Sequence, residues 1–145
     1  MCSTGAGFLG VGMALPERIV TNDEISQKVD TNNDWIVART GICERRICGP
    51  DENSATLGIS AARRALDNAG ISPDEIDMVI CATATGVAPW PSTACLIQDE
   101  IGAKNAGAFD LSAACSGFVY GIATASALIQ NGTHRYVLVV GVDTL

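Results

Sequence analysis

Two apolar runs constrain the fold of this chain more than any other feature. The segments MVICATAT at residues 78–85 and RYVLVVGV at residues 135–142 are dominated by apolar side chains. A strand with one wetted face alternates apolar and polar residues, whereas a strand covered on both faces is apolar throughout. Both segments are therefore predicted to be strands of a sheet that is buried on its two faces.

Helical segments separate these strands. Residues 54–69 have the clearest amphipathic pattern, with Ile59, Ala62 and Leu66 at helical spacing. The remaining long elements are predicted as strands at residues 7–14 and 106–112 and helices at residues 90–102 and 115–132. Strands that alternate with helices predict the α/β class, with layered helices and a mostly parallel sheet.

Two short helices are predicted nearer the start of the chain. Thr21 and Glu24 form a capping-box pattern that opens the first helix. Thr31 is the expected cap of the second helix, with Asp34 in its first turn and Gly41 at its end.

Composition and charge exclude several classes of function. The 145 residues are 48% hydrophobic and 17% charged, which fits one globular domain or one half of a larger one. The formal net charge of -7 argues against a nucleic-acid partner and against docking on an anionic membrane. His134 is the single histidine, so a metal site built from several imidazoles is excluded within this chain.

Residues 111–133 contain no charged side chain, and a stretch of this length is a candidate membrane span. Small and polar residues interrupt it, so the favoured interpretation is a helix of a globular core, covered on all sides. The first 13 residues lack the basic region of a secretory signal, and the six cysteines form no Cys-x-x-Cys pair. We therefore expect a cytoplasmic protein with free thiols.

Gly5, Gly7 and Gly10 match the G-x-G-x-x-G pattern of dinucleotide-binding loops. That motif needs a strand before it and a helix after it, and here the segment itself is the predicted strand. Close packing of two backbones is the better explanation of these glycines.

Cys115 is the candidate nucleophile, because it falls between a predicted strand and a predicted helix. Unpaired N–H groups and the helix dipole at such a position favour thiolate over thiol. The same N–H groups can stabilise the oxyanion formed when sulfur attacks a carbonyl, which is the chemistry of acyl transfer through a thioester. The alternative is an inert, buried cysteine, which is the interpretation preferred for Cys43, Cys48, Cys81 and Cys95.

The segment AFDLSAACSGFVYG around Cys115 resembles the nucleophile segment of β-ketoacyl-acyl-carrier-protein synthase III, a family of the thiolase superfamily. The pattern D-W-I-x-x-R-T-G-I-x-x-R-R-I at residues 34–47 is similar to the signature that separates this family from other condensing enzymes. Further matching segments follow the family's order at residues 15–25, 89–103 and 135–145.

The resemblance implies a role for particular residues. Cys115 would take an acyl group, expected to be acetyl, from coenzyme A, and decarboxylative condensation with malonyl-acyl-carrier protein would follow. Thr31, Trp35 and Arg39 match positions that contact the nucleotide end of coenzyme A in this family. Trp90 matches the bulky residue that closes the acyl pocket of the partner subunit in a homodimer. No metal or redox cofactor is implied, because coenzyme A serves as a substrate carrier.

The family also uses a histidine and an asparagine from the second half of its chain. His134 lies in a predicted turn away from Cys115, and Asn131 has the pattern of a helix C-cap. Residues 1–145 are therefore expected to be the N-terminal half of a layered αβαβα fold, with the C-terminal half outside this chain. By itself this half is expected to lack condensing activity, to leave an apolar face unpaired and to be poorly soluble.

Three alternatives stay open at this point. A ketosynthase of a secondary pathway, which primes a polyketide or a quinolone, would share the same residues. A non-catalytic dimerisation or scaffold module would leave Cys115 inert, and all the thiols would then react alike with iodoacetamide. A nucleotide-binding domain rests only on the glycine pattern at residues 5–10.

Overall fold

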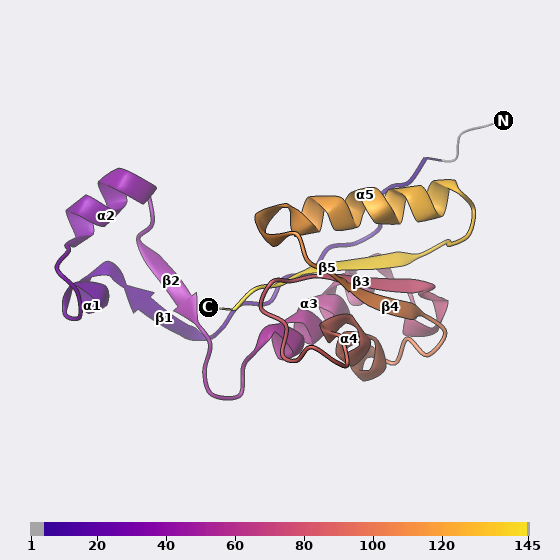
Figure 1. Cartoon of the computed structure of the whole chain (residues 1–145), viewed down its shortest axis with the longest axis horizontal. Helices are drawn as coiled ribbons and strands as arrows, with labels where there is room; N and C mark the ends of the chain where they lie inside the picture. Colours follow the sequence, from indigo (N-terminus) through magenta and orange to yellow (C-terminus); the bar gives the residue numbers. More distant parts are fainter. Residues whose placement is uncertain (1–4, 145) are drawn as a thin grey trace. The chain divides into compact units, whose positions relative to one another are not determined.

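The computed structural model describes residues 5–144, which divide into two compact units. The first, here called the sheet unit, comprises the residues up to Ala14 together with Asn53–Thr144. The second, the hairpin unit, is Leu15–Glu52. Figure 1 labels the helices and strands of both units.

The sheet unit contains a three-stranded parallel sheet. Its strands are β3 (Met78–Ala82), β4 (Gly107–Leu111) and β5 (Val137–Gly141), in the order β4-β3-β5. The central strand β3 pairs with both neighbours, and its residues Val79 and Ile80 are completely buried. The predictions of an α/β fold and of a parallel sheet are therefore confirmed, although each strand is shorter than its apolar run.

Helices cover both faces of this sheet (Figure 1). On one face lie α3 (Ser54–Ala69) and α4 (Thr93–Ile101), and on the other lies α5 (Gly117–Gln130). A single-turn 3₁₀ helix, η1 (Pro73–Glu75), precedes β3. The main core lies between α3, α4 and the sheet, and its buried residues include Leu66, Cys81, Ile97, Leu138 and Val140.

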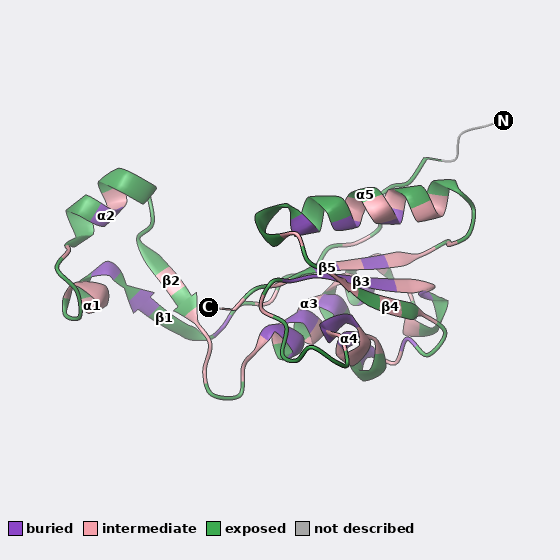
Figure 2. Cartoon of the chain, viewed as in Figure 1, coloured by how far each residue is buried: buried purple, intermediate pink, exposed green. Residues whose placement is uncertain are grey.

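Only one side of α5 is buried (Figure 2). The buried residues are Gly117, Gly121 and Ala125, and a Cβ on Gly121 would lie 2.9 Å from Val139. Phe118, Val119 and Tyr120 are exposed. The prediction of a helix covered all round is therefore wrong for the described chain, because only one side of α5 packs on the sheet, through its small residues and through the half-exposed Phe118, which lies next to Gly141. Within residues 5–144, no helix has both the length and the apolar character needed to cross a bilayer.

The segment predicted as a strand at residues 7–14 is extended but belongs to no sheet. Its contacts are with α3: the N–H of Val11 donates to Asn68 Oδ1 at 3.0 Å, and a Cβ on Gly10 would lie 2.6 Å from the carbonyl oxygen of Ala65. A Cβ on Gly12 would collide with the carbonyl of Ala61. The strand prediction is wrong because no strand of the described chain pairs with the segment, whereas the close packing expected of its glycines is confirmed at Gly10 and Gly12.

The hairpin unit contains an antiparallel strand pair that the sequence analysis did not predict. Strand β1 (Arg18–Thr21) pairs with β2 (Glu44–Ile47), and α1 (Asn22–Ser26) and α2 (Asn33–Thr40) lie between them in the chain. Its buried residues include the apolar Val20 and Ile36 and one polar residue, Asn22. Asn22 Nδ2 donates to Asn33 Oδ1 at 3.0 Å and to the carbonyl of Ile42 at 2.8 Å.

The caps of the two short helices agree with the sequence in part. Thr21 caps α1 and accepts a hydrogen bond from the N–H of Glu24 at 3.3 Å, as predicted. The cap of α2 is Asn32 and not Thr31, because the Asn32 side chain reaches the N–H of Trp35 at 2.9 Å. Gly41 ends α2 with φ 72°, as predicted.

Candidate active site

Cys115 lies between β4 and α5, as the sequence predicts. It belongs to η2 (Ala114–Ser116), a single 3₁₀ turn that leads directly into α5, and its side chain is exposed. Ala114 has φ 45°, in the left-handed region that residues with a Cβ rarely adopt. Such strain persists only where the surrounding structure enforces it, and it often marks functional sites. The left-handed conformation of Ala114 turns the chain sharply just before Cys115.

The backbone around Cys115 offers fewer free donors than predicted. The N–H groups of Ser116 and Gly117 already donate within the turn, to the carbonyls of Ala113 and Ala114. Within residues 5–144 the N–H of Cys115 itself meets no acceptor. The N–H of the nucleophile's own residue is therefore one available oxyanion donor at this turn.

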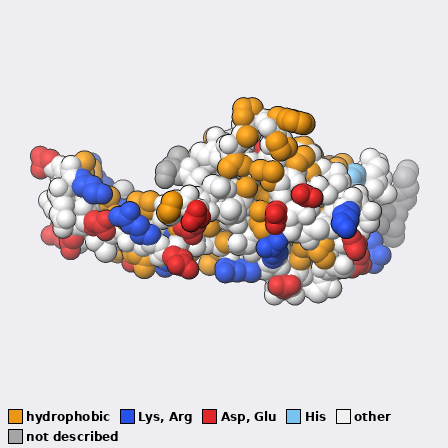
Figure 3. All heavy atoms as spheres, turned by 90° about the horizontal axis from the view of Figure 1, so that it is seen from below, with side chains coloured by type: hydrophobic (Ala, Val, Ile, Leu, Met, Phe, Trp, Pro, Cys, Tyr) orange, Lys and Arg blue, Asp and Glu red, His pale blue; other side chains and the backbone are white. Residues whose placement is uncertain are grey.

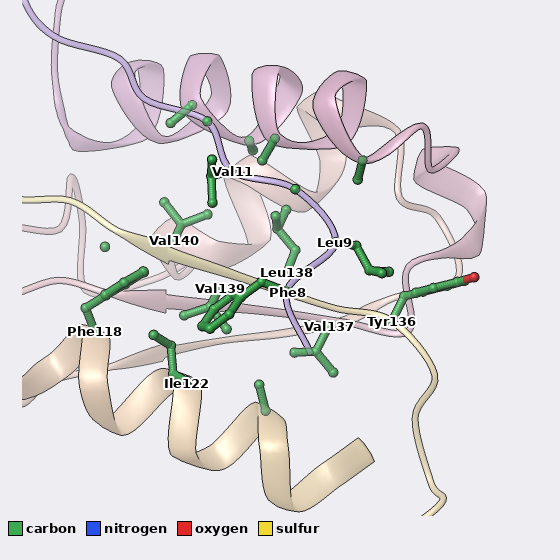
Figure 4. A pocket seen from close by; sticks show the side chains of 18 of the residues that line it. Phe8, Leu9, Val11, Phe118, Ile122, Tyr136, Val137, Leu138, Val139 and Val140 are labelled. Atoms are coloured by element: carbon green, nitrogen blue, oxygen red, sulfur yellow. The ribbon is translucent and has the colours of Figure 1, made fainter. Parts of the chain in front are cut away.

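A groove of about 620 Å³ lies within the sheet unit, and Cys115 is among its lining residues. In Figure 4, Phe118 and Ile122 project from α5 toward β5, and Phe8 and Val11 come from the N-terminal segment. The groove extends along β5, whose residues all line it, so its lining is mostly apolar, with Arg135 and Asp143 as its charged residues.

Two carboxylates lie at the end of the sheet where Cys115 follows β4. Asp110 is in β4, and Asp143 comes two residues after β5. The sequence analysis missed both, although an acidic residue at the end of an apolar strand was a visible signal. Burial raises the pKa of the Cys81 thiol in β3 to about 12, and the negative charges of Asp110 and Asp143 add to the rise. Cys81 is therefore an un-ionised, inert thiol, as predicted.

Trp35 and Arg39 lie together on α2. The Arg39 guanidinium is 5.3 Å from the centroid of the Trp35 ring, within the range of a cation–π contact. The indole is 55% exposed, so Trp35 is not a core residue. Thr31 Oγ1, just before the helix, is buried and has no hydrogen-bond partner within residues 5–144. These three residues belong to the hairpin unit, whereas Cys115 belongs to the sheet unit.

Trp90 lies in the segment between β3 and α4, which also belongs to the sheet unit. Its side chain is 86% exposed, the highest fraction among the exposed large hydrophobic residues of the described chain. An exposed indole between Pro89 and Pro91 is not explained by packing within this chain.

The other cysteines differ in their surroundings. Cys43 is exposed, which contradicts its predicted burial, because it follows α2 at the edge of the hairpin unit. Cys48 and Cys95 are half-buried, and the Cys95 sulfur lies 3.1 Å from the hydroxyl of Ser92. Cys2 lies outside the described residues.

His134 follows the C-terminus of α5, whereas Cys115 precedes its N-terminus. A helix of 14 residues is about 20 Å long, so this histidine is not available to the sulfur. Its side chain is half-buried and not exposed as predicted, and Asn131 is the C-cap of α5, as predicted. The described residues also contain no group of three or more His, Cys, Asp or Glu side chains that could hold a metal ion.

Acidic and basic side chains are interspersed on the face shown in Figure 3, with no large area of one sign. Hydrophobic side chains gather on the sheet unit in the same view. This face therefore lacks the continuous basic surface that a nucleic acid requires.

Comparisons with known proteins agree with the nucleophile segment and with the fold. A family model described as 3-oxoacyl-[acyl-carrier-protein (ACP)] synthase III matches residues 109–145, which include Cys115. The chain is 48% identical over 146 residues to the beta-ketoacyl-[acyl-carrier-protein] synthase III of Caldanaerobacter subterraneus subsp. tengcongensis, covering 100% of this chain and 44% of that protein.

Two solved structures share the fold closely. The 3-oxoacyl-[acyl-carrier-protein] synthase III from Aquifex aeolicus VF5 superposes with a TM-score of 0.90 at 45% identity, covering 92% of this chain and 43% of that one. The priming beta-ketosynthase from the R1128 polyketide biosynthetic pathway gives a TM-score of 0.90 at 46% identity, covering 92% and 40%. The chain thus spans less than half the length of the relatives that it matches.

Proposed function

We propose, because this chain belongs to the β-ketoacyl-[acyl-carrier-protein] synthase III family, that it carries the acyl-accepting site of a condensing acyltransferase. The observation that carries the proposal is the position of Cys115: an exposed thiol on a strained turn at the entrance to a helix. We further propose that these residues form the first half of a thiolase-like fold in a cytoplasmic homodimer.

In the first step, the Cys115 thiolate attacks the thioester carbonyl of an acyl-coenzyme A. A new C–S bond forms, the bond to the coenzyme A sulfur breaks, and the released thiolate takes up a proton. The N–H of Cys115, which has no acceptor within residues 5–144, supports the oxyanion of the intermediate. In the second step, malonyl-acyl-carrier protein loses carbon dioxide, and the carbanion attacks the acyl carbon. The S–C bond breaks and the Cys115 thiolate is regenerated.

The exposed pair on α2 suits the nucleotide end of coenzyme A. The Trp35 indole offers a stacking face for adenine, and the Arg39 guanidinium beside it supplies positive charge for a phosphate. Thr31, which directly precedes the N-cap of α2, is proposed as the third contact with the same ligand. No cofactor is required by this scheme, since coenzyme A enters as a thioester substrate and leaves as a product.

Trp90 is the proposed gate of the acyl pocket in the partner subunit. Its bulk and its exposure fit a side chain that packs against the partner subunit. Because an indole fills more space than smaller side chains, we expect the protein to prefer acetyl-coenzyme A to longer or branched primers.

The test uses the full-length protein that contains this chain, incubated with acetyl-coenzyme A and then mapped by peptide mass spectrometry. We expect one acetyl group on the peptide that contains Cys115 and no label in Cys115→Ala. Cys43→Ala removes a second exposed thiol and is the matched control, which should label like the wild type. Labelling that persists without Cys115 would exclude this residue as the nucleophile.

A second candidate is a priming ketosynthase of a secondary pathway, favoured by the 46% identity to the R1128 polyketide enzyme. Relative kcat/KM for a panel of acyl-coenzyme A thioesters separates the two, because a preference for primers longer than acetyl favours the secondary pathway. If no thioester labels the protein and all exposed thiols react equally with iodoacetamide, the non-catalytic scaffold is the correct interpretation. Residues 1–145 alone are expected to lack condensing activity.

A further inference from the structure

The loop formed by residues 83–92 connects β3 to α4 and carries Trp90. In the described part of the chain, residues 83–85 make side-chain hydrogen bonds at the start of the loop. At its end, the hydrogen bonds to another strand are made by Thr93 and Ala94, the first residues of α4. Each end meets a carboxylate that lies in, or two residues after, a strand flanking β3.

Asp143, which follows β5, holds the first end. Its Oδ1 accepts hydrogen bonds from the N–H of Ala84 at 2.8 Å and from the hydroxyl of Thr85 at 3.0 Å. The hydroxyl of Thr83 lies at 3.4 Å from the same oxygen. The Thr85 hydroxyl also accepts from the N–H of Thr144 at 2.9 Å. Thr85 therefore both donates a hydrogen bond to the segment after β5 and accepts one from it.

Asp110, in β4, holds the second end. Its two carboxylate oxygens accept from the N–H groups of Thr93 at 2.8 Å and Ala94 at 2.7 Å, which begin α4. A carboxylate at a helix N-terminus is favoured by the helix dipole and makes stronger hydrogen bonds than a neutral acceptor.

The two ends of the loop meet at its base. A Cβ on Gly86 would lie 3.0 Å from Thr93 Oγ1 and 3.8 Å from Asp110 Oδ2. The raised pKa of Cys81 in β3, to which both carboxylates contribute, agrees with their position on either side of that strand. Beyond this base the chain runs to Pro89, Trp90 and Pro91, where the two prolines restrict φ.

We propose that Asp110 and Asp143 are positioning residues, which hold the two ends of loop 83–92 and so fix the place at which Trp90 is presented. In this proposal both carboxylates act through the loop that they hold. If Trp90 gates the acyl pocket, as the proposed function states, they determine how strictly the protein selects its primer.

Three variants of the full-length protein test this. Asp110→Asn removes one of two acceptor oxygens, and Asp143→Ala removes the acceptor of the first end. Thr85→Val, which removes only a hydroxyl, replaces Asp143→Ala if that variant fails to fold. The matched control is Asp77→Ala, since Asp77 Oδ2 also accepts from two backbone N–H groups, those of Arg135 and Tyr136, at the opposite end of the sheet.

The first measurement is hydrogen exchange of the peptide that covers residues 83–94. We expect exchange to be about tenfold faster in the Asp110 and Asp143 variants, because local opening then costs less free energy. The control should leave this peptide unchanged. Unchanged exchange in both test variants would overturn the proposal.

The second measurement is the ratio of kcat/KM for acetyl-coenzyme A to that for a longer acyl-coenzyme A. It should fall about tenfold in the test variants, and not in Asp77→Ala, while iodoacetamide still modifies Cys115 at the wild-type rate. Faster exchange with an unchanged ratio would overturn the effect on selectivity. If the wild type forms no acyl-enzyme, the proposed function fails, and the exchange measurement decides by itself whether the carboxylates hold the loop.

Discussion

Gly10 is one of the residues whose small size the fold requires. A Cβ at this position would lie 2.6 Å from the carbonyl oxygen of Ala65 and from the N atom of Ala69, both in the backbone of α3. Neither atom can rotate away as a side chain would. A Cβ on Gly7, in the same segment, would have no such neighbour within 4 Å.

Gly10→Ala should therefore lower the free energy of unfolding by about 1–3 kcal/mol, the usual cost of forcing extra atoms into a packed contact. Urea denaturation followed by circular dichroism measures the change, and Gly7→Ala is the matched control. Equal stabilities of the two variants would show that the N-terminal segment does not lie against α3.

The buried thiol of Cys81 gives a pH dependence with a defined sign. In the unfolded chain the pKa of this thiol is near the ordinary value of 9.0, whereas in the folded chain the thiol keeps its proton up to about 12. Between these values the unfolded state binds fewer protons, so stability must fall as the pH rises.

Thermal unfolding measured across this alkaline window should show a steeper loss of stability in the wild type than in Cys81→Ala, which has no thiol to titrate. The comparison of slopes separates the effect from the smaller overall stability of the alanine variant. Parallel curves would mean that the Cys81 thiol is not shielded from solvent.

At the scale of single elements, α3 has the best-defined start. Asn53 Oδ1 accepts from the N–H groups of Ala55 and Thr56, each at 3.0 Å, and Thr56 Oγ1 accepts from the N–H of Asn53 at 2.9 Å. This reciprocal box satisfies donors that a helix N-terminus otherwise leaves free.

Asn53→Ala should reduce the free energy of unfolding by about 1 kcal/mol, as expected for the loss of a helix cap. Asn131→Ala, at the C-terminal end of α5, is the control, since Asn131 caps its helix through the backbone N–H. Similar losses in both variants would argue that the box contributes nothing specific.

Elements with local signals were predictable from the sequence. The apolar runs gave β3 and β5, helical spacing gave α3, and Gly41 and Gly70 mark the ends of α2 and α3 with positive φ. Elements that depend on a distant partner were not. The strands β1 and β2, which pair Arg18 with Ile47, have no alternating apolar pattern in their sequences. Residues 7–14 have the composition of a strand, but no strand of the described chain pairs with them.

The candidate site divides in the same way. The position of Cys115 follows from its place between a strand and a helix, which the sequence displays directly. Two features of the site cannot be predicted in this way: the left-handed φ of Ala114 and the hydrogen bonds of Asp110 and Asp143. They arise only when strands far apart in the chain lie side by side. The family resemblance placed Trp35 and Arg39 in one binding site, but their cation–π contact was not predicted.

At the scale of the whole molecule, the exposed side of α5 is the dominant feature. Phe118, Val119 and Tyr120 present large apolar side chains at a groove whose lining is mostly apolar. Contiguous surfaces of this kind mark sites that contact another polypeptide or cause aggregation.

Residues 1–145 prepared alone should therefore bind the dye 8-anilinonaphthalene-1-sulfonate and sediment as a mixture of oligomers. Val119→Lys combined with Tyr120→Lys should reduce both effects, whereas Lys104→Ala, on an exposed residue of the opposite side of the sheet unit, should not. A monomer that binds no dye would contradict the exposure of this helix side.

The strand order has a consequence for synthesis on the ribosome. The central strand β3 takes one neighbour from β4 and the other from β5, which is the last strand of the described chain. During translation, β3 therefore leaves the exit tunnel long before Val137–Gly141 exists. The nascent polypeptide must carry one unpaired edge of a very apolar strand through that interval, which is when a chaperone would have most to protect.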